Sequence, residues 1–171
     1  GIGKTIFASN LGVALAQLGK TTVLVDLDLG SSNLHTCLGI KNRHPGIGSY
    51  IYKKAEDLQS LVVETEVPKL FFIPGDSLFP GTANLPYFTK QKILKELSAL
   101  PADYVILDLG AGSAYNTIDF YLSSSAGIIL STPETTAILS AYSFLKSTVY
   151  RLLFRSFKAK SREREIIREF V

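Results

Sequence analysis

The chain begins with the sequence GIGKT at residues 1–5 and runs straight into an apolar stretch at residues 6–18. Glycines let the backbone curl so that successive N–H groups point inward and can cradle phosphate oxygens. The helix that follows would present the positive end of its dipole to the same anion. Lys4 would add a charge for the β- and γ-phosphates, and the Thr5 hydroxyl could ligate Mg²⁺. By itself, so short a motif is also compatible with a glycine turn before an amphipathic helix.

Two later segments each combine an apolar, β-branched run with an acidic end. Residues 21–26 end at Asp26, with Asp28 two positions further on, and residues 104–108 end at Asp108. Ligands of open α/β sheets lie at the carboxyl ends of the strands, and carboxylate oxygens suit Mg²⁺. With the loop upstream, these acids indicate a nucleotide–magnesium site. The other interpretation is that the strand-end acids only cap the turns that follow them.

Helical and strand patterns alternate along the chain. Apolar residues at helical spacing predict a helix over residues 6–18, closed by Gly19, and continuous apolar runs predict buried parallel strands. A short helix or a turn is expected near residues 33–40. Further helices are expected near residues 87–99, 116–124 and 133–154, the strands at 21–26, 70–73, 103–108 and 127–131, and a loop at 75–86. This alternation predicts an α/β fold, a doubly wound parallel sheet with helices on both faces in three layers. No repeat or linker marks a second domain, so we expect one domain over residues 1–171.

Composition excludes several classes of protein. The lone Cys37 leaves no disulfide framework and no CxxC site, and it fits a reducing compartment. No apolar run approaches the roughly 18–20 residues of a membrane span, and no secretory signal is visible. These features predict a cytoplasmic location. Because the chain contains no methionine and begins inside a phosphate loop, we expect it to be a piece of a longer protein.

Basic residues concentrate in a tail at residues 151–171. This tail holds seven of the chain's 18 basic residues and three of its 15 acidic ones, so it carries a charge of +4 and the remainder −1. Apolar and aromatic side chains are interleaved with the basic ones. The tail is either a solvated helix end that packs on other parts of the protein or a contact surface for an acidic partner, anionic lipid or nucleic acid.

Taken together, the motifs resemble the deviant-Walker ATPases of the MinD/ParA type, whose loop reads KGGxGKT. Residues 1–5 match the last five positions of that loop, and DLDLGSSN at residues 26–33 matches the family's first switch. Asp108, followed by Gly110 and Gly112, resembles the Walker B motif and second switch, although LGAG replaces the proline-containing DxPxG pattern. TPETTAILSAY at residues 132–142 is similar to the flagellar-number regulator branch, FlhG or FleN.

The resemblance implies a P-loop NTPase fold, with ATP or ADP and Mg²⁺ as ligands. Residues expected to contact the nucleotide are Gly1, Ile2, Gly3, Lys4, Thr5, Ile6 and Gly112. Lys4 and Asp28 would be catalytic, with Asp28 orienting the attacking water. Thr5, Asp26 and Asp108 would lie at the metal. The family's signature lysine, its first strand and its C-terminal third lie outside this chain.

The resemblance also implies a function. It is that of a switch that dimerises with ATP, hydrolyses it weakly under stimulation by a protein activator, and helps position or count a flagellum, division site or chromosome. Peripheral contact with the inner face of the plasma membrane, or with DNA, would come through the parent protein. The alternative is an ATP-dependent amide ligase of the cobyrinate diamide synthase or dethiobiotin synthetase type, which the lack of a nucleophilic Cys/His pair disfavours. An iron–sulfur carrier of the same superfamily is disfavoured by the missing CxxC.

Overall fold

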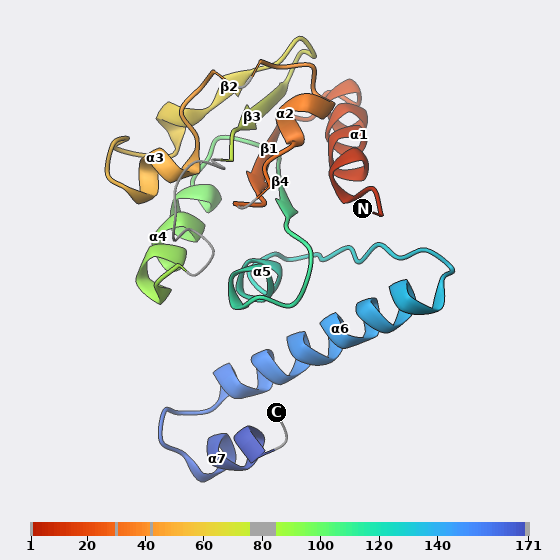
Figure 1. The fold of residues 1–171 in the computed structure, drawn as a ribbon. Helices are drawn as coiled ribbons and strands as arrows, with labels where there is room; N and C mark the ends of the chain where they lie inside the picture. Colours follow the sequence, from red (N-terminus) through yellow and green to blue (C-terminus); the bar gives the residue numbers. More distant parts are fainter. Residues whose placement is uncertain (1, 30, 42, 76–84, 170–171) are drawn as a thin grey trace. The chain divides into compact units, whose positions relative to one another are not determined.

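The structure is a computed structural model in which residues 2–29, 31–41, 43–75 and 85–169 are described (Figure 1). The chain divides into two compact units, essentially residues 3–111 and residues 112–171. The first unit contains all of the described strands, and the second is helical. One domain over residues 1–171 stays a prediction. Most of the loop expected at residues 75–86 lies outside the described residues.

A four-stranded sheet forms the centre of the first unit. Its strands are β1 (Thr22–Leu27), β2 (Val63–Glu64), β3 (Leu70–Ile73) and β4 (Tyr104–Leu109), in the order β2-β3-β1-β4. β1 pairs in parallel with β3 and β4, whereas β2 adds an antiparallel edge to β3. The parallel-dominant sheet confirms the predicted α/β class. β2 was not predicted, because a two-residue strand carries no periodic signal.

Among the described residues, four α-helices accompany the sheet. They are α1 (Lys4–Gln17), α2 (Leu34–Cys37), α3 (Ile47–Ile51) and α4 (Tyr87–Ser98), and a 3₁₀ turn, η1, spans Gln59–Leu61. α1 contacts β1, β4 and α2. In Figure 1, α3 and α4 lie on the other side of the strands from α1. The sheet is therefore covered on both faces, as predicted.

Helix α1 meets the sheet through small side chains. Its buried residues are Ala8, Ser9, Gly12 and Ala16, whereas Ile6 and Leu18 are 61% and 77% exposed. A Cβ on Gly12 would lie 2.9 Å from a methyl carbon of Leu24, so the helix approaches β1 too closely for a larger residue. The helix and its end at Gly19 are confirmed. The large apolar residues that predicted it do not, however, form its buried face.

The register of the strands brings two acids level with each other. Strand β1 is buried along its whole length, as predicted, whereas β4 is mostly half-buried because it is an edge of the described sheet. Leu24 lies between Phe72 and Ile106 in the paired register. Two residues further along the same face, Asp26 is level with Asp108. Both acids thus lie at the carboxyl end of adjacent parallel strands.

The second unit consists of α5 (Tyr115–Tyr121), α6 (Thr135–Ser156) and α7 (Arg162–Glu169). The helices predicted near residues 116–124 and 133–154 are confirmed. The strand predicted at residues 127–131 is wrong, since this segment forms no strand and Ile128 is 58% exposed. An apolar run becomes a strand only when a neighbour pairs with its N–H and C=O groups. No strand of the described chain does so here.

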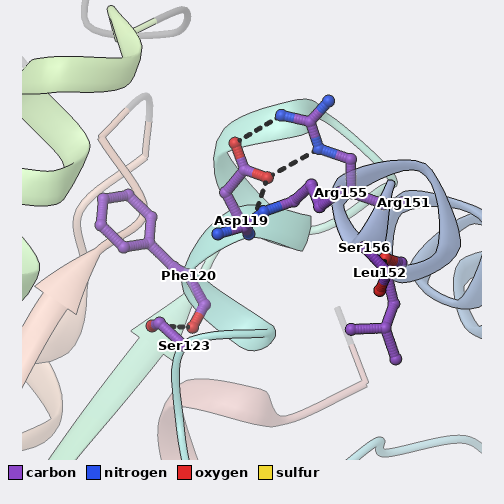
Figure 2. A network of polar contacts seen from close by, with 7 residues as sticks. All are labelled: Asp119, Phe120, Ser123, Arg151, Leu152, Arg155 and Ser156. Atoms are coloured by element: carbon purple, nitrogen blue, oxygen red, sulfur yellow. Dashed lines mark hydrogen bonds and ion pairs between the residues drawn. The ribbon is translucent and has the colours of Figure 1, made fainter. Parts of the chain in front are cut away.

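A buried carboxylate joins α5 to α6 (Figure 2). Asp119 accepts hydrogen bonds from Nε and Nη2 of Arg151 at 2.8 and 3.0 Å, and Nη1 of Arg155 lies 3.5 Å from the same carboxylate. The planar guanidinium matches both carboxylate oxygens at once, which fixes the orientation of α6 on α5. The Arg151 guanidinium also lies 4.8 Å from the ring centroid of Tyr115.

Basic side chains of the tail contact other residues of the second unit. Arg164 donates from Nε to the carbonyl oxygen of Phe154 at 2.9 Å, and its guanidinium lies 4.1 Å from the Phe154 ring centroid. Lys158, Lys160 and Arg162 are exposed. An interaction surface on this tail stays a prediction. Across the part of the chain that the structure describes, no helix has the length and apolar character needed to cross a membrane.

Candidate nucleotide-binding site

The N-terminal end of α1 is shaped as an anion site. Gly3 precedes the helix with φ +86°, a left-handed conformation that L side chains rarely adopt, and a Cβ there would meet nothing within 4 Å. Within the described parts of the chain, no side chain caps this helix. The N–H groups of a first helical turn have no acceptor within the helix, so they are available to an anion. Gly1, the first residue of the predicted loop, lies outside the described residues.

Thr5 connects the loop to the end of β4. Its side chain hydrogen-bonds the carboxylate of Asp108, which is only 4% exposed, and Lys4 lies close enough to stabilise the charge on that carboxylate. The two halves of the predicted site, the loop and the second acidic strand end, therefore meet. This contact joins residues 103 positions apart in the chain and follows from the docking of α1 onto β1 and β4.

The carboxylates of Asp26, Asp28 and Asp108 give the carboxyl ends of β1 and β4 a strongly negative charge. Burial raises the pKa of Asp108, and the charges of Asp26 and Asp28 raise it further, while Thr5 and Lys4 oppose the shift. A divalent cation here would relieve the repulsion among these carboxylates. The site therefore favours a ligand that brings positive charge with it.

Asp26 organises the loop after β1. Its Oδ1 accepts the Asp28 N–H at 3.1 Å, and its Oδ2 accepts the Ser32 hydroxyl at 2.7 Å and the Leu34 N–H at 3.1 Å. Burial raises the pKa of this fully enclosed side chain, and the three hydrogen bonds oppose that shift. Asp26 thus caps the turn and the start of α2. Its expected role at the metal stays a prediction.

Two residues that support Asp26 were missed in the sequence. Ser32 is buried, and its hydroxyl donates a hydrogen bond to the Asp26 carboxylate. Its place in the DLDLGSSN segment could have suggested this role. Gly75 follows β3, and a Cβ there would lie 2.9 Å from the carbonyl oxygen of Asp26 and 3.0 Å from its carboxylate. The sequence placed Gly75 only at the start of the predicted loop over residues 75–86, because its contact with β1 depends on the sheet order.

For several of the residues predicted to contact the nucleotide, the structure does not show a place at the site. The side chain of Ile6 is exposed, so only its backbone N–H could face a phosphate. Ile2 and Gly112 group with the second unit, and Gly112 has φ +86°. The nucleotide contacts of these residues stay predictions.

The donor set suits magnesium bound together with phosphates. The described residues contain no group of three or more His, Cys, Asp or Glu that could hold a metal by itself. Mg²⁺ usually takes one or two protein oxygens, with phosphate oxygens and water completing its octahedron. Thr5 and Asp108 offer such oxygens beside the uncapped helix end, so the residues present fit a magnesium nucleotide.

An α/β sheet with a glycine loop and a helix N-terminus at the carboxyl ends of its strands defines the class of P-loop nucleotide-binding proteins. Residues 1–97 match the family model described as the CobQ/CobB/MinD/ParA nucleotide binding domain, and the chain belongs to this family.

Individual relatives agree with this assignment. The flagellum site-determining protein YlxH of Helicobacter pylori is 34% identical over 153 residues, covering 85% of this chain and 49% of YlxH. The structure of MinD with Mg-ADP from Pyrococcus horikoshii superposes with a TM-score of 0.76 at 22% identity, covering 89% of this chain and 61% of that one. Cobyrinic acid a,c-diamide synthase from Mycobacterium smegmatis, with ADP and magnesium, gives 0.74 at 22%, covering 87% and 62%. The chain spans about half the length of the curated relatives it matches.

Replacing Asp108 by Asn is expected to stabilise the nucleotide-free protein at pH 7. A carboxylate whose pKa is raised by burial costs the folded state stability once pH exceeds that pKa, whereas the amide carries no charge and can still accept from Thr5. We expect the unfolding midpoint to rise by about 2–4 °C, as about 1 kcal/mol would produce in a protein of this size. Near pH 4 the gain should shrink, because the raised pKa of the wild-type carboxyl favours its protonation in the folded state, which removes the buried charge.

Thermal unfolding followed by circular dichroism at both pH values tests this expectation. Glu56→Gln, which neutralises an exposed carboxylate on the same unit, is the control and should change the midpoint little. A midpoint for Asp108→Asn at or below that of the wild type at pH 7 would contradict it.

Proposed function

We propose that the parent protein is an ATP-driven switch that binds Mg·ATP at this site, dimerises in that state and separates after slow hydrolysis. The observation that carries the proposal is the contact of Thr5, at the start of α1, with Asp108, at the end of β4. It joins the phosphate loop to the acidic strand end in the way that a magnesium nucleotide requires. Hydrolysis by this class of site needs charge neutralisation and a positioned water rather than a covalent intermediate.

Each residue has a role in this proposal. The N–H groups at the start of α1 and Lys4 would bind the β- and γ-phosphates. Thr5 and Asp108 would hold the metal, with Asp26 near it. Bound Mg²⁺ would supply neutralisation of the charge that develops on the phosphate oxygens. Asp28, half-buried beside this group, orients the attacking water. Gly112 and residues 1–3 complete the nucleotide contacts.

The cellular role is proposed from the relatives. YlxH of Helicobacter pylori is named as a flagellum site-determining protein, which supports a role in placing or counting flagella. A homodimer formed with ATP and a protein that stimulates hydrolysis belong to this proposal. So does contact with the inner face of the plasma membrane or DNA, for which the exposed Lys158, Lys160 and Arg162 of the tail are the candidate residues.

An amide ligase remains the alternative, since the family's name includes CobQ and CobB. At 22% identity, however, the similarity to the cobyrinic acid diamide synthase extends to the fold alone. A ligase of this type uses ATP to activate a carboxylate or a carbamate, so its turnover depends on that substrate and on a source of ammonia or of bicarbonate. A switch turns over without either.

Phosphate release from ATP by the full-length parent protein separates the two functions. We expect slow release with ATP and Mg²⁺ alone, unchanged when cobyrinic acid or diaminopelargonic acid is added with ammonia or bicarbonate, respectively. Release that appears only in the presence of one of these substrates would favour the biosynthetic function. No release under any condition, together with no binding of ATP, would contradict both.

A further inference from the structure

The second unit contains a cavity of about 550 Å³ between α5, α6 and α7. Sites that bind small organic ligands usually measure about 300–1,000 Å³, so a ligand of that kind fits this volume. The described residues that line the cavity all fall between Ser113 and Arg168. The cavity is therefore made by residues other than those assigned to the phosphate loop and to the magnesium ion.

Side-chain contacts hold the three helices around the cavity. The carboxylate of Asp119 and the guanidinium of Arg151 join α5 to α6 (Figure 2). Arg164 joins α7 to α6, because it donates to the carbonyl oxygen of Phe154 and its guanidinium lies 4.1 Å from the centroid of the Phe154 ring. The cavity is thus bounded by helices that contact one another, rather than being a gap between unconnected segments.

Three aromatic side chains line the cavity. Tyr115 belongs to α5, and Tyr150 and Phe154 lie about one turn apart on α6. Tyr115 is 62% exposed, so solvent reaches this wall of the cavity, whereas Tyr150 and Phe154 are half-buried. Aromatic side chains bind other flat rings by offset stacking or by edge-to-face contact. This lining favours a ligand that contains an aromatic ring.

The charged side chains of the lining are basic. Arg151 and Arg168 line the cavity, and no Asp or Glu does so among the described residues. Asp119 pairs with Arg151, whereas Arg168 forms no ion pair with any described residue. The hydroxyl of Ser147 adds a neutral hydrogen-bonding group from α6. An anionic ligand would find a partner in Arg168, and a cationic ligand would be repelled.

We propose that this cavity binds a small anion that carries a flat aromatic ring, a class that includes nucleotides and aromatic carboxylates. The anionic group pairs with Arg168, and the ring packs against Tyr150 and Phe154. Arg151 is held in place by Asp119, so this part of the wall is already ordered before a ligand arrives. The site is separate from the proposed binding of Mg·ATP at the phosphate loop, and neither proposal depends on the other.

The probe for the test is 8-anilinonaphthalene-1-sulfonate, an aromatic sulfonate whose fluorescence rises when it leaves water. Fluorescence titration of the full-length protein should show a saturable site with a dissociation constant of about 10–100 µM, the usual affinity for a ligand of this size. Lys4→Ala should bind the probe as the wild type does, since Lys4 belongs to the phosphate loop and does not line this cavity.

Two substitutions alter the cavity in different ways. Arg168→Ala removes the pairing charge and should raise the dissociation constant of the probe by about 10-fold, the low end of the range for a charge-assisted hydrogen bond. Ser147→Phe places a ring in the cavity and should abolish binding of the probe. Because Arg168 is exposed, its replacement should change the unfolding midpoint little, so Arg168→Ala tests the site even if Ser147→Phe folds poorly.

Arg162→Ala and Ser140→Phe are the matched controls. Arg162 is another exposed arginine of α7, and Ser140 is an exposed serine about two turns before Ser147 on α6. Neither of them lines the cavity. Both variants should bind the probe with the affinity of the wild type.

Displacement of the probe identifies the source of the ligand. Guanosine 5′-monophosphate and 4-hydroxybenzoate each combine an aromatic ring with an anionic group, whereas guanosine lacks the charge and inorganic phosphate lacks the ring. At least one of the first two compounds should displace the probe at concentrations at which the last two do not. Displacement by guanosine 5′-monophosphate alone indicates a nucleotide, and displacement by 4-hydroxybenzoate alone indicates an aromatic carboxylate.

Four results would overturn the inference. The first is no saturable binding of the probe, or binding that neither Arg168→Ala nor Ser147→Phe weakens. The second is an equal loss of binding in the matched controls. The third is loss of binding in Lys4→Ala, which would place the probe at the phosphate loop. The fourth is displacement by guanosine or phosphate as effective as that by the charged ring compounds, or displacement by none of the four.

Discussion

Replacing Lys4 by Ala is expected to lower the affinity for Mg·ATP by roughly 10- to 150-fold. Lys4 stands at the first position of α1, next to Thr5, and would give a charge-assisted hydrogen bond to the phosphates. Such bonds contribute about 1.5–3 kcal/mol, which corresponds to that range of affinity. In a cradle formed by backbone N–H groups, water cannot replace the missing charge. Calorimetric titration of the full-length protein with Mg·ATP measures the loss.

Lys20→Ala is the matched control for this experiment. Lys20 is an exposed lysine beyond the other end of the same helix, so its removal changes the net charge equally without touching the site. We expect its affinity to match that of the wild type. Undiminished affinity in Lys4→Ala, or an equal loss in both variants, would contradict the assignment of the phosphate loop.

Asp28→Ala is expected to slow ATP hydrolysis by roughly 100-fold or more while leaving ATP binding nearly intact. A side chain that positions or deprotonates the nucleophile typically contributes a factor of that size. Asp28 is half-buried and its carboxylate accepts no hydrogen bond from the described residues, so removal of this side chain should cost the fold little. Single-turnover phosphate release, combined with calorimetry, separates the two effects.

Asp57→Ala serves as the control, since Asp57 is an exposed carboxylate on the same unit. It should hydrolyse ATP at the wild-type rate. If Asp28→Ala loses binding and hydrolysis in the same proportion, Asp28 belongs to the binding site and not to the step that activates water.

The sequence predicted those features that follow from a local residue pattern together with the general rules of parallel sheets. The apolar runs at residues 21–26 and 104–108 predicted β1 and β4, and the carboxyl ends of parallel strands meet at one edge of a sheet. That rule predicts that Asp26 and Asp108 lie at the same edge, and the register of β1 and β4 confirms it. The GIGKT loop likewise predicted a helix start beside the same edge.

Features that depend on which elements touch were not predictable from the sequence. The apolar segment at residues 127–131 has the composition of a strand, yet it has no partner in the described sheet. The buried face of α1 consists of small residues because Gly12 packs on Leu24, which no periodicity of large apolar residues reveals. The close approach of Gly75 to the backbone and carboxylate of Asp26 arises only once β3 pairs with β1.

The central claim, that nucleotide binding at this site controls association of two copies, is tested most directly by sedimentation velocity of the full-length Asp28→Ala variant. Because the variant should bind ATP without hydrolysing it, we expect a dimer with Mg·ATP and a monomer with Mg·ADP at the same protein concentration. Monomers with both nucleotides, at concentrations of ATP that calorimetry shows to be saturating, would contradict the account.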